Sequence, residues 1–261
     1  MTQVRQPSLV HLRAPAGRSA ARAQNFLVEW LEAVEGSASS VFEQILLLPD
    51  AGATLVHDGS TTEAPPRSVC ILPPGRTTIT PQGIAAVLRS LEPGERTEAL
   101  NEAAYRDPDP RIDGIGTPGV ARRDAGRVRV LAIDDLKAPP DNPRLKMLRS
   151  ATLSINWVEY EGPRDRTKLS PHAHRNFEQG SLALAGEFVH HLRVPWTADA
   201  NAWVADRHER LGSPSLLVVP VELVHTSEGV GPGRHLLVDV FSPPREDFIA
   251  KGWMLNAGDY A

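Results

Sequence analysis

The feature that most constrains the fold is a succession of short apolar runs separated by turns rich in glycine, proline and aspartate. Proline accounts for 23 of the 261 residues, against a usual share of about 5%, and this excess disfavours long helices. Short runs at this spacing are typical of an all-β sandwich or barrel with few short helices. The runs that we interpret as strands are 45–48, 54–56, 68–72, 84–88, 128–133, 152–160, 181–185, 188–192, 216–219 and 236–241.

One early segment has a different periodicity. Counting from Phe26, its apolar residues fall at i, i+1, i+4, i+5 and i+8, and Gly36 follows as a stop. This spacing places the apolar side chains on one face of a helix. We therefore expect residues 1–35 to form an arm followed by a helix over 19–34.

A second exception is the polar segment 91–126. It contains the turn signals Pro93-Gly94 and Asp107-Pro108-Asp109-Pro110 and no apolar run of strand length. Clusters of this composition are typical of loops. We expect a linker here, with one short helix around residues 97–105.

Composition excludes several classes of protein. A net charge of -4 gives no electrostatic reason to expect nucleic acid as a partner. No stretch approaches the roughly 18 apolar residues of a membrane-spanning helix, and residues 1–13 lack the apolar block of a secretory signal. The single cysteine, Cys70, excludes a disulfide framework and a cysteine-based metal cage. We therefore expect a cytoplasmic protein without a membrane or nucleic-acid partner.

A weak internal repeat runs through the chain in a consistent order. Phe42-Glu43-Gln44 and Phe177-Glu178-Gln179 each lead into an apolar run. Leu72-Pro73 and Val219-Pro220 then open matching turns, and each copy closes on a further apolar run. Three matches in one order predict a duplicated β unit, so the chain is expected to hold two similar domains.

The histidines are concentrated in the second half, where seven of the nine lie after residue 170. The sharpest pattern is Pro171-His172-Ala173-His174. Residues i and i+2 of a strand point to the same face, so His172 and His174 are expected to project side by side. Two imidazoles at this spacing suit one divalent transition ion. Another pass of the chain must then supply an oxygen ligand and a third nitrogen.

Here the sequence resembles the cupin family, whose members are jelly-roll β-barrels (double-stranded β-helices) that hold a metal ion at the barrel centre. The first motif of the family reads G-x5-H-x-H-x3-4-E-x6-G, and it matches His172, His174 and Gly186. Counting forward from His174 puts the acidic position at Glu178, whereas counting back from Gly186 puts it at Gln179. The motif therefore leaves two residues open for the oxygen ligand.

The second motif of the family, G-x5-P-x-G-x2-H-x3-N, is matched in part. Pro220 and His225 keep the spacing of the family, whereas Glu222 stands at the turn glycine and Gly229 replaces the asparagine. The resemblance implies that His225 joins His172, His174 and either Gln179 or Glu178 in holding one ion of Fe, Mn, Ni, Zn or Cu.

Strand alternation bears on the choice between Gln179 and Glu178. If Gln179 faces the barrel interior, so do small residues at 181, 183 and 185, and Leu182 and Leu184 pack against another layer. If Glu178 faces in, the leucines line the barrel. A metal pocket needs room near the ion, so we prefer Gln179, with Glu178 as the alternative ligand or a supporting residue. A neutral amide would leave the charge of the ion uncompensated and favour an anionic substrate.

The resemblance also implies a division of the chain. Residues 127–261 are expected to form the metal-binding cupin barrel, and 36–126 a degenerate cupin barrel plus the linker. In this first barrel the repeat places Ser37, Ser39 and Thr78 where the histidines would be, so we expect no metal there. Its expected role is structural: to cover the second barrel, to close its mouth or to build a homodimer.

Three further residues are candidates for lining the pocket, namely His190, His191 and Arg193. Adjacent strand residues point to opposite faces, so His190 and His191 cannot both be ligands. Arg193 could bind a carboxylate. Glu178, His190 or His191 could serve as a general base.

The function that the resemblance implies is a mononuclear metal-dependent enzyme acting on a small polar or anionic molecule. Dioxygenase chemistry ranks first because it is a common role of two-barrel members. The alternatives are a metal-dependent isomerase or lyase, and a non-catalytic protein that binds a small ligand.

Overall fold

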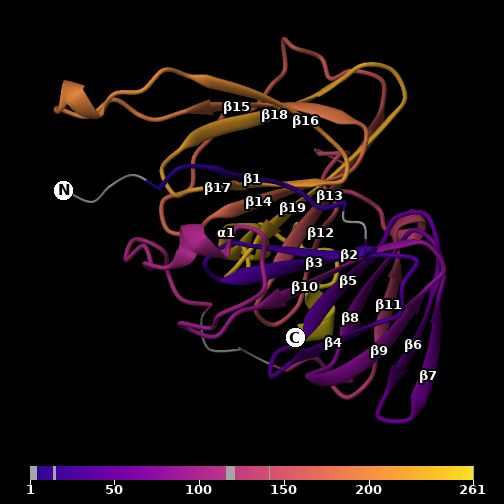
Figure 1. Cartoon of the computed structure of the whole chain (residues 1–261). Helices are drawn as coiled ribbons and strands as arrows, with labels where there is room; N and C mark the ends of the chain where they lie inside the picture. The colour runs from indigo at the N-terminus through magenta and orange to yellow at the C-terminus, as the bar shows by residue number, and fades with distance from the viewer. Residues whose placement is uncertain (1–4, 14–15, 116–120, 141, 261) are drawn as a thin grey trace.

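The computed structural model describes residues 5–13, 16–115, 121–140 and 142–260. It consists of two β-barrels, each made of two antiparallel sheets (Figure 1), and the expected all-β fold is confirmed. The first barrel joins a sheet of six strands to a sheet of four. In order across these sheets the strands are β11 (Arg129–Ala132), β8 (Ser68–Leu72), β5 (Gln44–Leu48), β10 (Ile84–Ser90), β3 (Phe26–Glu32) and β2 (Arg18–Arg22), and then β4 (Gly36–Ser40), β9 (Gly75–Pro81), β6 (Ala53–His57) and β7 (Ser60–Ala64).

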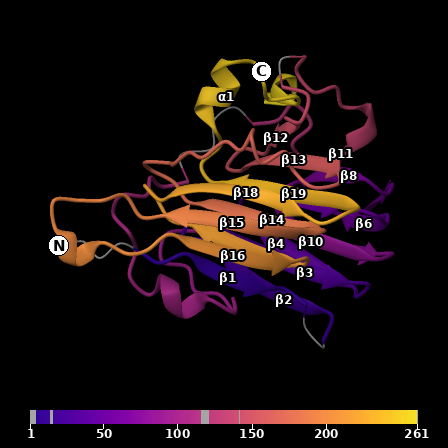
Figure 2. The same ribbon diagram turned by 90° about the horizontal axis from the view of Figure 1, so that it is seen from above.

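The second barrel joins a sheet of six strands to a sheet of three. In order across these sheets the strands are β1 (Ser8–His11), β17 (Ser215–Val219), β14 (Gln179–Ala185), β19 (Arg234–Phe241), β13 (Ser154–Glu161) and β12 (Met147–Arg149), and then β16 (Arg207–Gly212), β15 (Glu187–Arg193) and β18 (Val224–Val230). Seen from above, the strands of the second barrel lie in front of those of the first (Figure 2).

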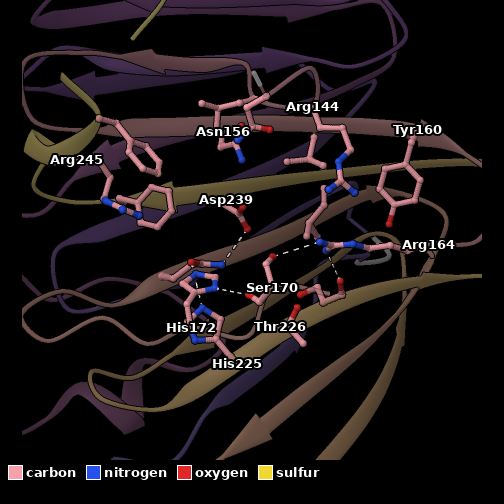
Figure 3. A pocket seen from close by; sticks show the side chains of 18 residues that line it. Arg144, Asn156, Tyr160, Arg164, Ser170, His172, His225, Thr226, Asp239 and Arg245 are labelled. Carbon is pink, nitrogen blue, oxygen red and sulfur yellow. Dashed lines mark hydrogen bonds between the residues drawn. The ribbon is translucent and has the colours of Figure 1, made fainter. Parts of the chain in front are cut away.

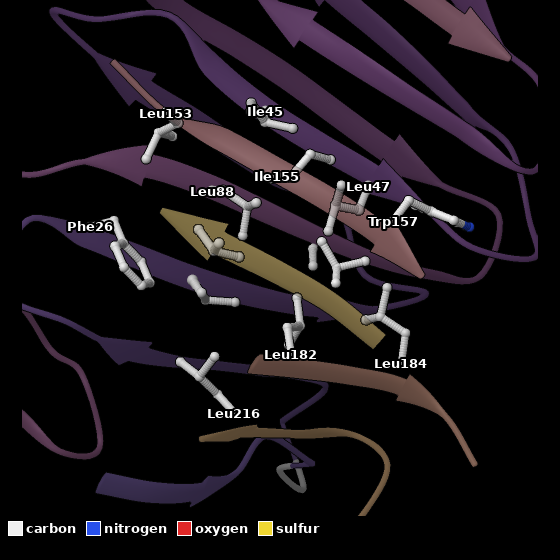
Figure 4. Packing of buried hydrophobic residues seen from close by; sticks show 14 of the residues in the cluster. Phe26, Ile45, Leu47, Leu88, Leu153, Ile155, Trp157, Leu182, Leu184 and Leu216 are labelled. Atoms are coloured by element: carbon white, nitrogen blue, oxygen red, sulfur yellow. The ribbon is translucent and has the colours of Figure 1, made fainter. Parts of the chain in front are cut away.

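The main hydrophobic core lies between the two six-stranded sheets, which pack face to face (Figure 4). Phe26 and Leu47 of the first barrel meet Trp157 and Leu182 of the second there. A separate core, which includes Leu46, fills the interior of the first barrel. Neighbouring residues of β5 therefore enter different cores, and all five of its residues are buried.

The helix expected over 19–34 is wrong, because this segment forms β2 and β3. Strand β3 lies inside its sheet, between β10 and β2. Trp30 packs in the core between the barrels, whereas Leu31 packs in the core of the first barrel. A strand with two buried faces carries adjacent apolar residues, and this produced the spacing that resembled a helix.

The two barrels pair their strands in matching registers, in agreement with the internal repeat. Strand β5 opens on Gln44, which lies opposite Leu72, and β14 opens on Gln179, which lies opposite Val219. These are the residues that the repeat aligns. The correspondence continues along the opposite sheets.

In the first barrel Ser37 lies opposite Thr78. In the second barrel His172 and His225 occupy the corresponding places, joined by an isolated antiparallel bridge. The pairing of His172 with His225 therefore matches that of Ser37 with Thr78, as the alignment made from sequence expects.

Two strands cross the division expected at residue 126. Strand β1, from the expected arm, pairs with β17 of the second barrel. Strand β11, from the expected second barrel, pairs with β8 of the first. Without them β8 and β17 would be sheet edges with unpaired backbone groups, and such edges are normally covered.

The helical segments are short. In the described part of the expected linker, 91–115 and 121–126, there is no strand and one 3-10 turn, and residues 116–120 lie outside the described residues.

No helix of the described part of the chain is long and apolar enough to cross a bilayer. The helical segments are η1 (Glu102–Tyr105), η2 (Ile133–Asp135), η3 (Ala200–Ala202), α1 (Glu246–Ala250) and η4 (Ala257–Tyr260).

An ion network at the rim joins the two barrels. Glu159 of β13 accepts two hydrogen bonds from Arg67 of the first barrel, at 2.8 and 2.9 Å. It also accepts from Arg234 at 2.6 Å and from Trp157 at 3.2 Å, and Arg234 contacts Asp50 of the first barrel. Burial alone would raise the pKa of Glu159, but these hydrogen bonds outweigh it and lower the pKa to about 2.

We expect Glu159→Gln to lower the free energy of unfolding by about 1–3 kcal/mol at pH 7, the cost of losing charge-assisted hydrogen bonds. Because the pKa of Glu159 is depressed in the folded state, its contribution is complete above the unfolded value near 4.5 and is lost as pH falls towards 2. Urea unfolding at pH 7 and at pH 3 measures both effects. The solvent-exposed pair of Glu187 and Arg210 is the control, and Glu187→Gln should change the free energy of unfolding far less, because exposed ion pairs contribute little.

Candidate metal centre

Three histidines converge at one end of the second barrel. His172 and His174 lie in the segment before β14, and His225 lies on β18. One ring nitrogen from each lies within 4.8 Å of the others, and His174 and His225 are buried whereas His172 is exposed. A regular strand was expected for His172 and His174, but neither residue lies in one. The bridge to His225, with N···O distances of 2.8 and 3.0 Å, fixes this segment instead.

Gln179 completes the cluster. Its Oε1 atom lies 2.9 Å from Nε2 of His174 and 3.2 Å from Nε2 of His225. On the other side its Nε2 group donates to Ser181 Oγ and to Asp239 Oδ1, both at 3.0 Å. A carboxylate accepts and does not donate, so Asp239 holds the NH₂ group of the amide and leaves the oxygen facing the histidines.

The hydrogen bonds of the imidazoles direct lone pairs into the cluster. Nδ1 of His225 lies 2.9 Å from the Leu223 carbonyl, and Nδ1 of His172 lies 2.8 Å from the Ser170 carbonyl. A carbonyl only accepts, so both Nδ1 atoms carry hydrogen, and in the neutral ring Nε2 is then an acceptor. Nε2 of His225 thus faces the oxygen of Gln179, acceptor against acceptor. A cation placed between these two lone pairs would attract both, so the nitrogen and oxygen atoms of the cluster fit a metal ion.

Electrostatics favour the same protonation state. Burial lowers the pKa of His174 to about 3 and that of His225 to about 4. Both imidazoles are therefore neutral near pH 7. A metal ion needs the neutral form of histidine, so these two residues would bind one without first losing a proton.

Glu178, the alternative ligand, is not brought into this cluster. Its carboxylate faces the first barrel, where it accepts from the backbone N–H of Gln24 at 2.7 Å and lies 3.5 Å from both Tyr105 Oη and Arg5 Nη1. Leu182 and Leu184 face the core between the barrels, which is the alternation expected when Gln179 faces inwards. The surroundings of Glu178 also exclude it as a general base at the histidines.

The matching glutamate of the first barrel has equivalent partners. Glu43 accepts from Arg122 at 3.1 Å, from the backbone N–H of Ala151 at 3.0 Å and from Tyr260 at 2.8 Å. Ala151 belongs to the second barrel, just as the turn held by Glu178 belongs to the first. Each glutamate of the repeat therefore binds a turn of the opposite barrel, and this explains its recurrence in a barrel that lacks the histidines.

The three residues that were expected to line the pocket do not lie on the same face of their strand. His190 points inwards and is buried; its Nδ1 atom lies 2.8 Å from Ser227 Oγ, and burial lowers its pKa to about 4. His191 points to the outer face, 3.1 Å from Glu228. Arg193 is paired there with Asp206 at 2.6 Å. His191 and Arg193 line a smaller cavity of about 220 Å³ and are not among the residues that line the larger cavity beside the histidines.

That larger cavity has a volume of about 300 Å³ and is lined by His172, Gln179 and His225 among others. Sequence reasoning missed several of its residues (Figure 3). Asp239 is one of them, and burial raises its pKa to about 6. In the sequence, Asp239 is marked only as a charged residue inside the apolar run 236–241. Arg144 and Arg164 also line the cavity and come from loops, where sequence gave no signal.

Comparison with known proteins shows the fold. No family model and no curated protein match the chain. Among solved structures, AerE from Microcystis aeruginosa has a TM-score of 0.57 at 9% identity, covering 92% of this chain and 99% of that chain. HEPD from Streptomyces albus, solved with 2-hydroxyethylphosphonate and Fe(II) bound, has a TM-score of 0.56 at 10% identity, covering 96% and 79%. Procruciferin, an 11S globulin from Brassica napus, has a TM-score of 0.54 at 10% identity, covering 97% and 92%.

These identities are too low to carry an activity from one protein to another, but the coverage extends over both barrels. The sequence pattern, the matching registers and the solved structures agree. The chain has the cupin fold, with two barrels in one polypeptide.

Proposed function

We propose that the protein is a mononuclear metal-dependent enzyme acting on a small polar or anionic molecule. The observation that carries this proposal is the convergence of three histidine nitrogens within 4.8 Å, with an amide oxygen held against two of them. His172, His225 and Gln179 line a cavity of about 300 Å³, which is at the lower end of the range for ligand pockets.

The donor set limits the choice of ion. Imidazole nitrogens suit Fe, Mn, Ni, Zn and Cu, whereas Mg and Ca prefer oxygen ligands. His172, His174, His225 and Gln179 would hold the ion. In that place it would supply Lewis-acid polarisation or, as Fe(II), dioxygen chemistry.

The residues of this chain supply orientation. Asp239 and Ser181 fix the amide of Gln179, and the backbone carbonyls of Ser170 and Leu223 fix two of the imidazole rings. None of the four proposed ligands carries a negative charge, so the site would keep the positive charge of the ion available to an anionic substrate.

Within this class, dioxygenase chemistry is our first choice, supported by the Fe(II) in the HEPD structure, and isomerase or lyase chemistry is the alternative. A globulin shares the fold, so the fold alone does not separate an enzyme from a non-catalytic protein that binds a small ligand. Oxygen uptake with candidate small organic acids separates the dioxygenase from the other possibilities.

Elemental analysis of protein purified without chelator tests the metal site. We expect about one equivalent of transition metal per chain in the wild type and loss of the metal in the double variant His172→Ala/His174→Ala, because two nitrogen ligands disappear. His208→Ala, which alters an exposed histidine on the outer face, should keep the metal. Wild-type protein that takes up no metal even after reconstitution, or a double variant that retains it, would contradict the proposal.

A further inference from the structure

Two arginines lie at the end of the large cavity away from the histidines. Arg144 precedes β12, Arg164 follows β13, and both line the cavity. Figure 3 shows their guanidinium groups close together, pointing towards one another. A third arginine of the wall, Arg245, is neutralised by Asp247, with contacts of 2.7 and 2.8 Å.

Arg164 is held by neutral acceptors. Its Nη1 donates to the Ser227 carbonyl at 2.9 Å, and its Nη2 lies 3.3 Å from Ser170 Oγ and 3.4 Å from the Lys168 carbonyl. Its Nε atom is shielded from solvent and has no acceptor. Arg144 has no carboxylate partner among the residues that the structure describes. Within the described part of the chain, neither guanidinium forms an ion pair with a carboxylate, and the buried Nε donor of Arg164 is left unsatisfied, which is costly.

The electrostatic environment is consistent with this geometry. Burial and then repulsion by the charge of Arg144 lower the pKa of Arg164, whereas Tyr160, Asp239 and Glu228 act in the opposite direction. An anion between them would remove this repulsion. Asp239 also faces the cavity, but it is hydrogen-bonded to Gln179 and Ser181.

Tyr160 adds a donor at the same end. Its oxygen accepts a hydrogen bond from the backbone N–H of Gly229 at 3.1 Å, which leaves its own O–H free to donate. Arg144, Arg164 and Tyr160 therefore present donors to the cavity. A planar guanidinium fork matches the oxygens of a carboxylate or a phosphate.

The end of the cavity that carries these donors is connected to the histidine cluster through Ser170. Ser170 lies within hydrogen-bond distance of Arg164 through its hydroxyl, and it accepts from His172 through its carbonyl. One residue thus separates the arginine from a proposed metal ligand. A molecule small enough for about 300 Å³ would reach both ends.

We propose that Arg144 and Arg164, with Tyr160, form a binding site for the anionic group of the substrate, a carboxylate or a phosphate-type oxyanion, while the other end of the same molecule meets the histidine cluster. The substrate class is then a small organic acid with a second polar group. The anion site itself does not depend on the proposed function. Only the contact between the other end of the substrate and the histidine cluster rests on it.

The test uses chelator-treated wild-type protein and two probes, inorganic phosphate and acetate, titrated at constant ionic strength and followed by thermal unfolding. A ligand that binds the folded state raises the melting temperature with concentration. We expect at least one probe to do so, and we expect Arg164→Gln and Arg144→Gln each to raise its dissociation constant about tenfold or more, the effect of losing a charge-assisted contact. Arg144 is exposed, so the second variant remains informative if the first does not fold.

Arg166→Gln is the matched control. Arg166 lies in the same loop but is 76% exposed and paired with Glu228, so its removal should leave the dissociation constant unchanged. The probe that binds identifies the oxyanion as phosphate-like or carboxylate-like. No binding of either probe, or equal losses in all three variants, would overturn the site. Metal content is measured on a portion of each preparation that has not been treated with chelator: a wild type that binds metal but no anion refutes this site alone, and one that binds the anion but no metal refutes the proposed function alone.

Discussion

Replacing Gln179 with alanine is expected to weaken the binding of a divalent transition ion by about 100-fold or more. Residues that merely orient ligands already account for about 10–100-fold in metal affinity, and Gln179 is proposed to supply a ligand atom itself. The variant also leaves the carboxylate of Asp239 without its 3.0 Å donor. Titration of chelator-treated protein with Zn²⁺, in competition with a chromophoric chelator, measures the change.

Glu178→Gln is the matched control, because it changes the adjacent residue to the same amide that stands at position 179. Glu178 is buried, but its partners, Gln24, Tyr105 and Arg5, lie on the side of the first barrel. None of these partners contacts the histidines or the amide of Gln179, so the metal affinity should stay nearly constant while stability falls. Equal losses of affinity in the two variants would mean that the inward orientation of Gln179 does not decide which residue binds the ion.

The positions of the proposed ligands could be predicted because they depend on local rules. Gln179 faces inwards because side chains alternate along a strand, and small residues were expected beside it. The alignment of His172 and His225 with Ser37 and Thr78 followed from a repeat whose two copies keep the same register. Such features need only the sequence of each strand and its partner.

What could not be predicted depends on contacts between the barrels and on loops. The spacing of apolar residues after Phe26 indicated a helix, because nothing local shows that Trp30 and Leu31 enter different cores. Strand β11 joins the first barrel because β8 needs a partner, a requirement of the whole sheet. Arg144 and Arg164 approach each other from loops separated by β12 and β13, and loop conformation has no periodic signature.

The largest loss of stability is expected from Phe26→Ala. The ring of Phe26 is 1% exposed and lies in the core between the six-stranded sheets (Figure 4). Truncation of a buried phenylalanine costs about 3–5 kcal/mol, because transfer energy and a residual cavity add. Urea unfolding measures the cost.

Gly180 of β14 shows whether this cost arises from contact across the two barrels. A Cβ atom at Gly180 would lie 2.9 Å from Cζ of Phe26 and 3.3 Å from a methyl carbon of Leu216, so Gly180→Ala should cost about 1–3 kcal/mol by overpacking. In the Phe26→Ala background the added methyl enters the space left by the ring, and the cost should largely disappear. Gly212→Ala, with no atom within 4 Å of its Cβ, is the control and should not depend on Phe26. Strictly additive costs for Phe26 and Gly180 would show that the two sheets do not pack against each other at this point, because residues in contact are energetically coupled.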